Sequence, residues 1–435
     1  MKKRIMSYFP MSVFLIIIIF YFMNFVIELG GSVFNLTYDK SAQSQQTVID
    51  WAEKYPFMSV DEKATATEEK NQSKTFLGNV EDLITKIKAS VEYHLKESFV
   101  LNRQLIEFNG AVNSVLGKNI VTGMESSVVQ LKNGQLVQAD ESMSSNDYAY
   151  VIDEILEFAD NIEKNDVPFI YVQMPNKVCK YDPQLPLGVQ HHLNDQMDRT
   201  VKDLTEAGYP VVDLRENLNT LSDDYYSLFY NTDHHWKVET AFYAAEVIES
   251  YLNSNVFSGG NEKSILDRSN FHEIVYEKSF LGYLGRQVTL GNARPEDFTL
   301  LLPNDTIDYT ISCPGRNLYK SGTFEDVLIN WEMFDDDKGL YDKSYYDSLL
   351  YGNQAVTTIV NESVEDNSKI LIIKDSFSLP MAMYLSTVYH EITLIDIRLN
   401  QGQFNGSVRA FVDEYRPDVV VLAMFPAANI AYRLE

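Results

Sequence analysis

The sequence predicts an α/β fold: a Rossmann-like sandwich of three layers, with helices on both faces of a parallel sheet. Two observations predict it. Segments typical of buried strands alternate with helical segments in the first half of the chain, and the same alternation returns near its carboxyl end. Strand and helix in alternation is the pattern of a parallel sheet. The 435 residues are enough for one large or two ordinary domains.

The amino-terminal segment predicts a membrane anchor. A basic cluster at residues 2–4 precedes an apolar run from Met11 to Val26, which can be extended to Leu29. This is about the length that a bilayer core requires. Residues 27–30 offer a poor signal-peptidase site, so we expect an uncleaved helix rather than a signal peptide. Residues 1–36 would form a cytoplasmic tip and a transmembrane anchor, and the rest of the chain would face the outside of the cell membrane.

The next segments lead into the globular part. Residues 37–76 are rich in Ser, Thr, Gln, Glu and Lys and predict a solvated stalk. Residues 77–435 are expected to form one domain that opens with a helical preface, because apolar residues recur at helical spacing from Val80 to Leu116. Asn133-Gly134 between two apolar runs then predicts a β-hairpin over residues 128–137.

The central elements follow from apolar periodicity and from the residues that end each segment. In the first half we expect helices at 147–164 and 193–207 and strands at 169–174 and 210–214. In the second half we expect strands at 369–374, 391–397 and 417–424 and helices at 379–389 and 407–416. Residues 255–350 are rich in Asp and Tyr, and we interpret them as an inserted loop-rich region that borders the site.

Composition excludes some functions. The net charge of −26 argues against a nucleic-acid partner, because a phosphate backbone would be repelled. The acidity otherwise indicates solubility and does not reveal a substrate. Cys179 and Cys313 are too few for a disulfide framework or a structural zinc site. Each is interpreted first as a small buried residue, and a single disulfide stays open. No cofactor and no metal is expected.

The clearest local signal is the tetrapeptide Asp-His-His-Trp at residues 233–236, just before a helix that should begin near Val238. An aspartate two residues before a histidine can hold the imidazole in one tautomer and stabilise the imidazolium. An N-capping aspartate, a metal site or two surface histidines are the alternatives. Neighbouring side chains point in different directions, so we assign His235 rather than His234 to the site, with Asp233 as its partner.

The second signal is the box Lys-Asp-Ser-Phe-Ser at residues 374–378. A strand pattern ends in Asp375-Ser376, and a helix with Pro380 in its first turn follows. This places a hydroxyl on a strand-to-helix corner, where the helix N-terminus offers N–H groups to an oxyanion. The arrangement parallels a nucleophile elbow without its glycines. The alternative is that Ser376 or Ser378 only caps the helix.

Together the two boxes predict a catalytic triad of Ser376, His235 and Asp233, because a hydroxyl nucleophile needs a base and the base needs an orienting group. The prediction requires that His235 and Ser376 meet although about 140 positions separate them. Three further candidates concern the oxyanion or the substrate. Arg398 could stabilise an acyl oxyanion or bind an acidic sugar, or it could pair with Asp396 or Glu414. Asn353 could donate to the oxyanion or serve a turn, and Trp236 could stack on a sugar or pack beneath the site. Lys177 and Arg286 are weaker candidates.

Both boxes resemble those of the bacterial family named after the Asp-His-His-Trp tetrapeptide, the DHHW family. That family is similar to the alginate O-acetyltransferases and to SGNH hydrolase-like acyltransferases. The resemblance covers roughly residues 85–430, and its further pieces are Met174-Pro175-Asn176-Lys177, Phe280-Leu281-Gly282, Tyr351-Gly352-Asn353 and Asp396-Ile397-Arg398.

The resemblance implies the same triad on a circularly permuted SGNH-like sheet. It also implies transfer of an acyl group, with acetyl favoured, to a cell-surface carbohydrate polymer. It further implies a membrane-bound O-acyltransferase partner that passes acyl groups outward. Two other functions stay open: a carbohydrate esterase that uses water with the same triad, and a noncatalytic assembly or binding protein of the envelope.

Overall fold

The structure is a computed structural model of the chain. It describes residues 110, 120–122, 127–139, 145–257, 266–335, 337–399, 407–425 and 434. All of them belong to the unit Val100–Glu435. The expected anchor and stalk, and nearly all of the helical preface, lie outside the described residues. Within the described ranges, no helix is long and apolar enough to cross a membrane.

The centre of this unit is a mixed sheet of eight strands in the order β5-β4-β13-β11-β12-β10-β8-β9. Their bounds are β4 Phe169–Gln173, β5 Val211–Asp213, β8 Asp308–Cys313, β9 Leu318–Thr323, β10 Val356–Asn361, β11 Lys369–Lys374, β12 Glu391–Ile395 and β13 Val419–Ala423. Neighbours from β5 to β12 run parallel. The pairs β12–β10, β10–β8 and β8–β9 are antiparallel. The α/β class is confirmed, whereas the expectation of a purely parallel sheet is wrong at the β10, β8 and β9 edge.

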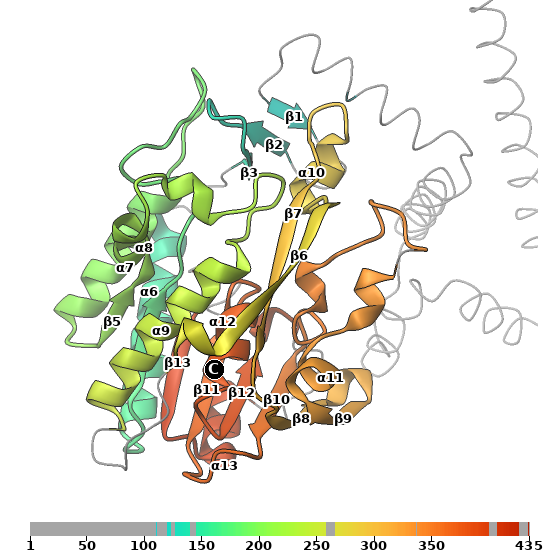
Figure 1. The fold of residues 1–435 in the computed structure, drawn as a ribbon. Coiled ribbons are helices and arrows are strands. Elements are labelled where there is room, and N and C mark those ends of the chain that lie inside the picture. Colours follow the sequence, from blue (N-terminus) through green and yellow to red (C-terminus); the bar gives the residue numbers. More distant parts are fainter. Residues whose placement is uncertain are drawn as a thin grey trace, which may run out of the picture. The chain divides into compact units, whose positions relative to one another are not determined.

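Helices cover both faces of the sheet (Figure 1). They are α6 Ser145–Glu163, α7 Leu193–Glu206, α8 Leu214–Leu221, α9 Val238–Asn255, α12 Ser378–Leu385 and α13 Val408–Tyr415. On β11, Ile370 and Ile372 enter the core that contains residues of α9 and α12, and Leu371 and Ile373 enter the core with residues of α6 and α13. Strands buried on both faces are apolar throughout rather than at alternate positions. This explains why β4, β11 and β13 are continuous apolar runs in the sequence.

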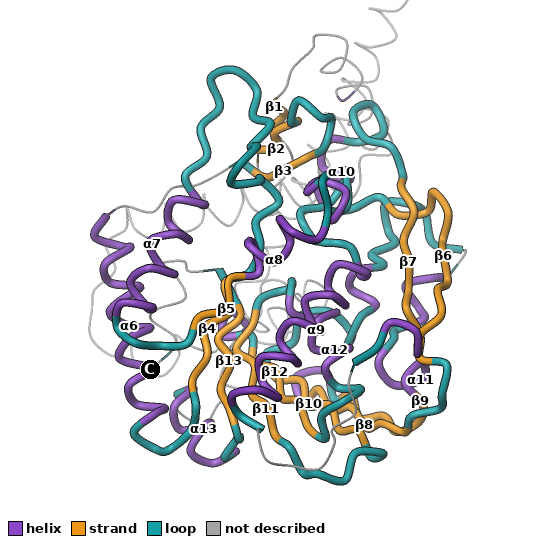
Figure 2. The backbone as a smooth tube through the Cα atoms, turned by 60° about the vertical axis from the view of Figure 1, so that its left-hand side comes forward, coloured by secondary structure: helices purple, strands orange, loops and turns teal. Residues whose placement is uncertain are grey.

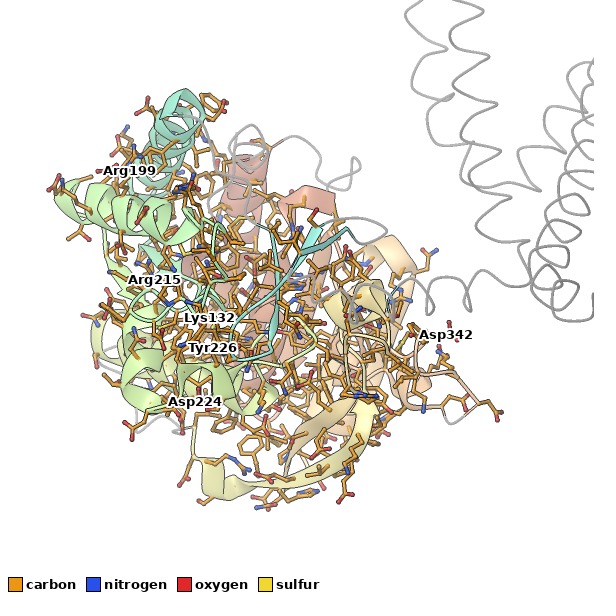
Figure 3. All side chains as sticks on the ribbon, turned by 90° about the horizontal axis from the view of Figure 1, so that it is seen from above. Lys132, Arg199, Arg215, Asp224, Tyr226 and Asp342 are labelled. Atoms are coloured by element: carbon orange, nitrogen blue, oxygen red, sulfur yellow. The ribbon has the colours of Figure 1, made fainter. Side chains whose placement is uncertain are left out.

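The elements around this sheet agree with the sequence signals. The predicted hairpin is β2 Ser127–Gln130 paired with β3 Leu136–Gln138, and Gly134 in its turn has a φ of 87°. Strand β1 Ile120–Thr122 pairs with β2 and completes a small sheet. Helices α6 and α7 pack together, and the guanidinium of Arg199 lies 4.1 Å from the centre of the Tyr148 ring (Figure 3).

The region predicted as a loop-rich insertion contains more regular structure than the sequence indicates. Strands β6 Phe271–Phe280 and β7 Glu296–Pro303 form a separate antiparallel ribbon (Figure 2). Strands β8 and β9 extend the main sheet, and the short helices α10 Tyr283–Val288 and α11 Phe324–Leu328 follow β6 and β9. These strands pair with one another and with β10, which lies after this region. Because the pairing depends on residues outside the segment, the local sequence did not predict the strands.

Candidate active site

The Asp-His-His-Trp segment is a loop that leads into α9. Phe229 and Trp236 pair as an isolated antiparallel bridge, which brings the two ends of the loop together. Within the loop, His235 Nδ1 lies 2.7 Å from Asp233 Oδ1, and the His235 backbone N–H donates to the same oxygen at 3.1 Å. The carboxylate thus fixes both the backbone and the ring of the histidine two residues later.

The second half of the site is the corner between β11 and α12. Ser376 is partly exposed on this corner, between the strand and the helix. Its Oγ lies 2.6 Å from His235 Nε2, although 141 positions separate the two residues. The structure therefore brings Asp233, His235 and Ser376 together in the order that a triad requires.

The capping alternative for the serines is not what the geometry favours. Helix α12 has Phe377 at its N-cap and no side-chain hydrogen bond there. Ser378 is fully buried, and its hydroxyl donates to the carbonyl of Ala423 at 3.0 Å. Of the two serines in the box, it is Ser376 that meets the imidazole.

Asp233 is buried and charged. Burial alone would raise the pKa of its carboxyl group, but His235, His234 and the hydrogen bonds from His235 and Tyr283 together lower that pKa well below its ordinary value. The Tyr283 backbone N–H donates to Oδ2 at 2.7 Å, at the start of α10. An ionised carboxylate at this position favours a protonated Nδ1 on His235, and Nε2 is then the acceptor for the Ser376 proton.

Aromatic rings hold the imidazole of His235 in place. The Tyr346 ring is stacked on it with centroids 3.9 Å apart, and the Phe377 ring lies 5.0 Å away. Trp236 is fully buried, and its Nε1 donates to the carbonyl of Phe377 at 3.1 Å. Trp236 therefore packs beneath the site and offers no face to a sugar, so the stacking alternative is wrong.

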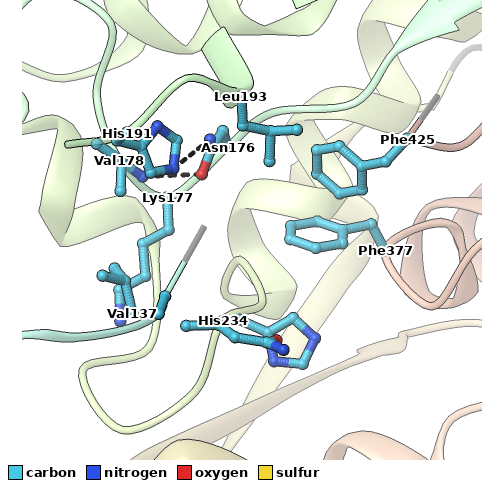
Figure 4. A pocket seen from close by; sticks show the side chains of 11 residues that line it. Val137, Asn176, Lys177, Val178, His191, Leu193, His234, Phe377 and Phe425 are labelled. Carbon is cyan, nitrogen blue, oxygen red and sulfur yellow. Dashed lines mark hydrogen bonds between the residues drawn. The ribbon is translucent and has the colours of Figure 1, made fainter. Parts of the chain in front are cut away.

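A pocket of about 310 Å³ opens beside this site (Figure 4). Its walls include His234, Phe377 and Phe425 on one side and Asn176, His191 and Leu193 on the other. His234 points to the pocket, whereas His235 points to Ser376, which agrees with the choice between the two histidines. Asn176 Nδ2 lies 3.2 Å from His191 Nε2. The lining is mostly apolar with a few polar groups, as is usual for sites of small organic groups.

The metal alternative also involves this loop. One ligand atom each from Asp233, His234 and His235 lie within 4.8 Å of one another. The Nδ1 of His235 and the Oδ1 of Asp233, however, are 2.7 Å apart, which is a hydrogen-bond distance. Two ligands of a tetrahedral zinc ion, each about 2.0–2.1 Å from the metal, lie roughly 3.3 Å apart. The geometry favours a proton between these two atoms.

Arg398 and Asn353 belong to an ion network at the end of β11, in which Lys374 and Asp396 are fully buried and the Arg398 side chain is partly exposed. Arg398 makes a bidentate pair with Asp396, with distances of 2.8 and 2.7 Å, as its alternative role predicted. Asn353 Oδ1 accepts from Lys374 Nζ at 2.5 Å, and Lys374, which is fully buried, lies 3.5 Å from Asp396. Both candidates thus support the end of β11. The pKa of His234 is lowered by burial, by His235 and, in smaller part, by the charge of Arg398, so Arg398 also acts on the site electrostatically.

The remaining candidates have structural partners. Arg286 donates to the carbonyl of Lys343 at 2.8 Å. Lys177 is buried against the carbonyls of the Asp-His-His-Trp loop. Cys179 and Cys313 are both free and buried, so the disulfide that the sequence left open is not formed.

Sequence reasoning missed three contributors to the site: Tyr346, Glu296 and the role of Gly282. Tyr346 and Glu296 lie in the region predicted to be loop-rich, and no local pattern marks them. Gly282 lies within the Phe280-Leu281-Gly282 piece of the resemblance, but its role depends on contact with Asp233, 49 positions earlier in the chain.

Comparison with known proteins bears on the fold and on the family resemblance. Residues 132–296 match the family model described as "SGNH hydrolase-like domain, acetyltransferase AlgX". The predicted resemblance is thereby confirmed. The structure of Bacillus cereus PatB1 with a sulfonyl adduct is similar, with a TM-score of 0.57 and 13% identity over 72% of this chain and 99% of that chain. A DHHW family protein from Eubacterium siraeum has a TM-score of 0.50 and 18% identity over 70% of this chain and 93% of its own. At these identities the likeness establishes the fold. None of the curated proteins matches the sequence.

Proposed function

We propose that this protein is an O-acyltransferase that moves an acyl group onto a hydroxyl of a carbohydrate polymer through a serine ester. The acyl group that we propose is acetyl. The observation that carries the proposal is the continuous chain Asp233, His235 and Ser376, with distances of 2.7 and 2.6 Å. The match to a family described as an acetyltransferase supports the acetyl group and the SGNH-like chemistry.

The first half of the reaction forms the ester. His235 Nε2 takes the proton of Ser376, and Oγ forms a bond to the acyl carbon of the donor. The bond from that carbon to the leaving group then breaks, and the leaving group takes the proton from His235. Asp233 stays ionised throughout and stabilises the imidazolium that forms. The negative charge of the tetrahedral intermediate would lie near the N-terminus of α12, where the helix dipole favours it.

The second half transfers the group. A sugar hydroxyl in the position of the leaving group gives its proton to His235 and attacks the ester carbon, and Ser376 regains its proton when its bond to that carbon breaks. The pocket beside His234 and Phe377 has room for more than an acetyl group and is the place we assign to the incoming molecule. Water in the same position would make the protein an esterase.

We also propose a cellular location, a partner and a sheet arrangement for this domain. We place the domain outside the cell membrane, held by an anchor within residues 1–36, and supplied by a membrane-bound O-acyltransferase partner because activated acyl donors are cytoplasmic. We further propose that the sheet is a circularly permuted SGNH arrangement, since Asp233 and His235 precede Ser376 in the chain. Cell fractionation and protease accessibility of the intact protein test the location.

Ester turnover tests the function. The protein is incubated with a chromogenic acetyl ester, with and without carbohydrate oligomers, and both free acetate and acetylated oligomer are measured by mass spectrometry. Ser376→Ala should lower turnover by about 10³-fold or more, because it removes the nucleophile. The matched control is Ser378→Ala in the same box, which should keep most of the activity.

Acetylated oligomer that depends on Ser376 supports transfer, and acetate alone supports the esterase. Turnover that Ser376→Ala leaves intact would reject the proposal.

A further inference from the structure

The loop that carries Asp233 is held by a buried cation. Lys177 follows β4 and is only 3% exposed. Its Nζ donates to the carbonyls of Tyr230 at 2.6 Å, Asp233 at 2.8 Å and Asn231 at 3.1 Å, and to the carbonyl of Leu136 in β3 at 2.7 Å. An ammonium has three protons, so these four acceptors use its whole donor capacity. The side chain borders the pocket (Figure 4), and its ammonium group donates to these backbone carbonyls.

A partly buried anion holds the same loop through its N–H groups. The Glu296 carboxylate, at the start of β7, accepts from the backbone N–H of Asn231 and of Thr232, both at 2.7 Å, and from the Thr232 hydroxyl at 2.6 Å. Burial raises the pKa of the Glu296 carboxyl group and lowers the pKa of the Lys177 ammonium group. Each shift is opposed by the charge of the other residue, and for Glu296 also by its hydrogen bonds. Each charge thus makes the burial of the other less unfavourable.

The two charges act on successive peptide groups of one short segment. Lys177 binds carbonyls and Glu296 binds N–H groups over residues 230–233, and the last of these is the residue whose carboxylate orients His235. We propose that Lys177 and Glu296 are a pair of positioning residues that hold this segment, and with it Asp233 and His235, in line with Ser376. The inference rests on the proposed function for its kinetic consequence, but not for its structural one.

Charged groups suit this task better than neutral ones. Hydrogen bonds to a charged group are roughly twice as strong as neutral ones, so the backbone groups bound by Lys177 and Glu296 are held more firmly than neutral partners would hold them. A misplacement of about 1 Å at a reacting centre can lower a rate by about 100-fold. Loss of either charge should therefore affect the chemical step more than the binding of a small ester.

The test compares Lys177→Met, Glu296→Gln and the double variant with Lys180→Met as the matched control. Lys180 lies three residues from Lys177 but is 30% exposed and pairs with Asp198 at the surface. Two quantities are measured: kcat and KM for a chromogenic acetyl ester, and the downfield proton resonance of the hydrogen bond between His235 Nδ1 and Asp233, which reports its geometry without any activity.

We expect Lys177→Met and Glu296→Gln each to lower kcat by about 10- to 100-fold with KM changed by less than about threefold, and to shift or broaden the resonance. The double variant should lose less than the product of the two single losses, because the residues act as a unit. Lys180→Met should match the wild type in both measurements. Should Lys177→Met not fold, Glu296→Gln, which keeps the shape and one acceptor oxygen, carries the test.

Failure of this inference differs from failure of the proposed function. If both variants keep the wild-type resonance and kcat within about threefold, or if KM alone rises, the positioning role is rejected while the triad stands. If the wild type has no ester activity but the resonance is lost only in these variants, the positioning role stands and the proposed function falls.

Discussion

The two halves of the site are built in different ways. The corner around Ser376 is formed by regular structure: β11 pairs in register with β13, and the Asp375 side chain accepts from the backbone N–H of Phe377 at 2.9 Å and of Phe425 at 3.0 Å. The loop around Asp233 is irregular and depends instead on groups outside the main sheet, namely Lys177, Glu296 and the start of α10. A corner made by a regular strand and helix is stable in itself, whereas an irregular loop needs partners from elsewhere.

This difference separates stability from catalysis. Changes at the corner outside Ser376 should lower mainly the free energy of unfolding, because they act on the sheet. Changes around the loop should lower mainly kcat, because the loop carries the base and its orienting group.

The largest effect should come from Asp233, and Asp375 in the other half provides the matched comparison. Asp233→Asn should lower kcat by about 10²–10⁴-fold, since an amide can donate to His235 Nδ1 and stabilise the wrong tautomer. Asp375→Asn should keep kcat within about tenfold, because the Asp375 carboxylate binds backbone N–H groups of Phe377 and Phe425 and does not contact His235. Steady-state kinetics on an acetyl ester measure both. Equal losses in the two variants would remove the distinction between loop and corner.

The next effect concerns Gly282, which precedes α10. A Cβ there would clash with Asp233 Cβ and lie 2.7 Å from Asp233 Oδ2, so Gly282→Ala must move α10 or the loop. We expect kcat to fall by about 10- to 100-fold. Gly208→Ala is the control: its φ of 93° makes the substitution strained, but no atom lies within 4 Å of the added Cβ. The control should lower the melting temperature and leave kcat unchanged.

A smaller effect is expected from Lys374 at the corner. Lys374→Met removes a buried cation from Asp396 and Asn353, but Asp396 keeps its bidentate pair with Arg398. The free energy of unfolding should fall by about 1–3 kcal/mol, which is less than for a buried charge left alone. Urea denaturation measures it, and kcat per folded molecule should stay within about threefold. A fall in kcat per folded molecule well beyond threefold would show that the corner also affects the chemical step.

The smallest effect is a pH dependence. The pKa of Asp233 is lowered in the folded protein, so its contribution to stability is present above its unfolded pKa of about 3.9 and is lost as the pH falls toward the folded value. The difference in unfolding free energy between wild type and Asp233→Asn should therefore shrink as the pH falls below about 4. Urea denaturation at several pH values tests this, and a difference that grows on acidification would contradict it.

The same contrast explains what could be predicted from the sequence. The strands at 369–374 and 169–174 and the corner at Ser376 are encoded by continuous apolar runs and a helix start, so local patterns were sufficient. The triad was predicted from residue chemistry and from the resemblance, because no local pattern shows that residues 235 and 376 meet. Glu296, Gly282 and Tyr346 could not be predicted, since each acts through a contact with a residue about 50 to 110 positions away.

The pairing of Ser376 with His235 is tested most directly by covalent labelling. The protein is treated with an aryl sulfonyl fluoride, which reacts with an activated serine hydroxyl, and the modified residue is identified by peptide mass mapping. We expect one adduct on the peptide that contains Ser376, a much slower reaction in His235→Ala, and no adduct on that peptide in Ser376→Ala. Labelling of a different residue, or labelling of Ser376 at the same rate without His235, would contradict the account.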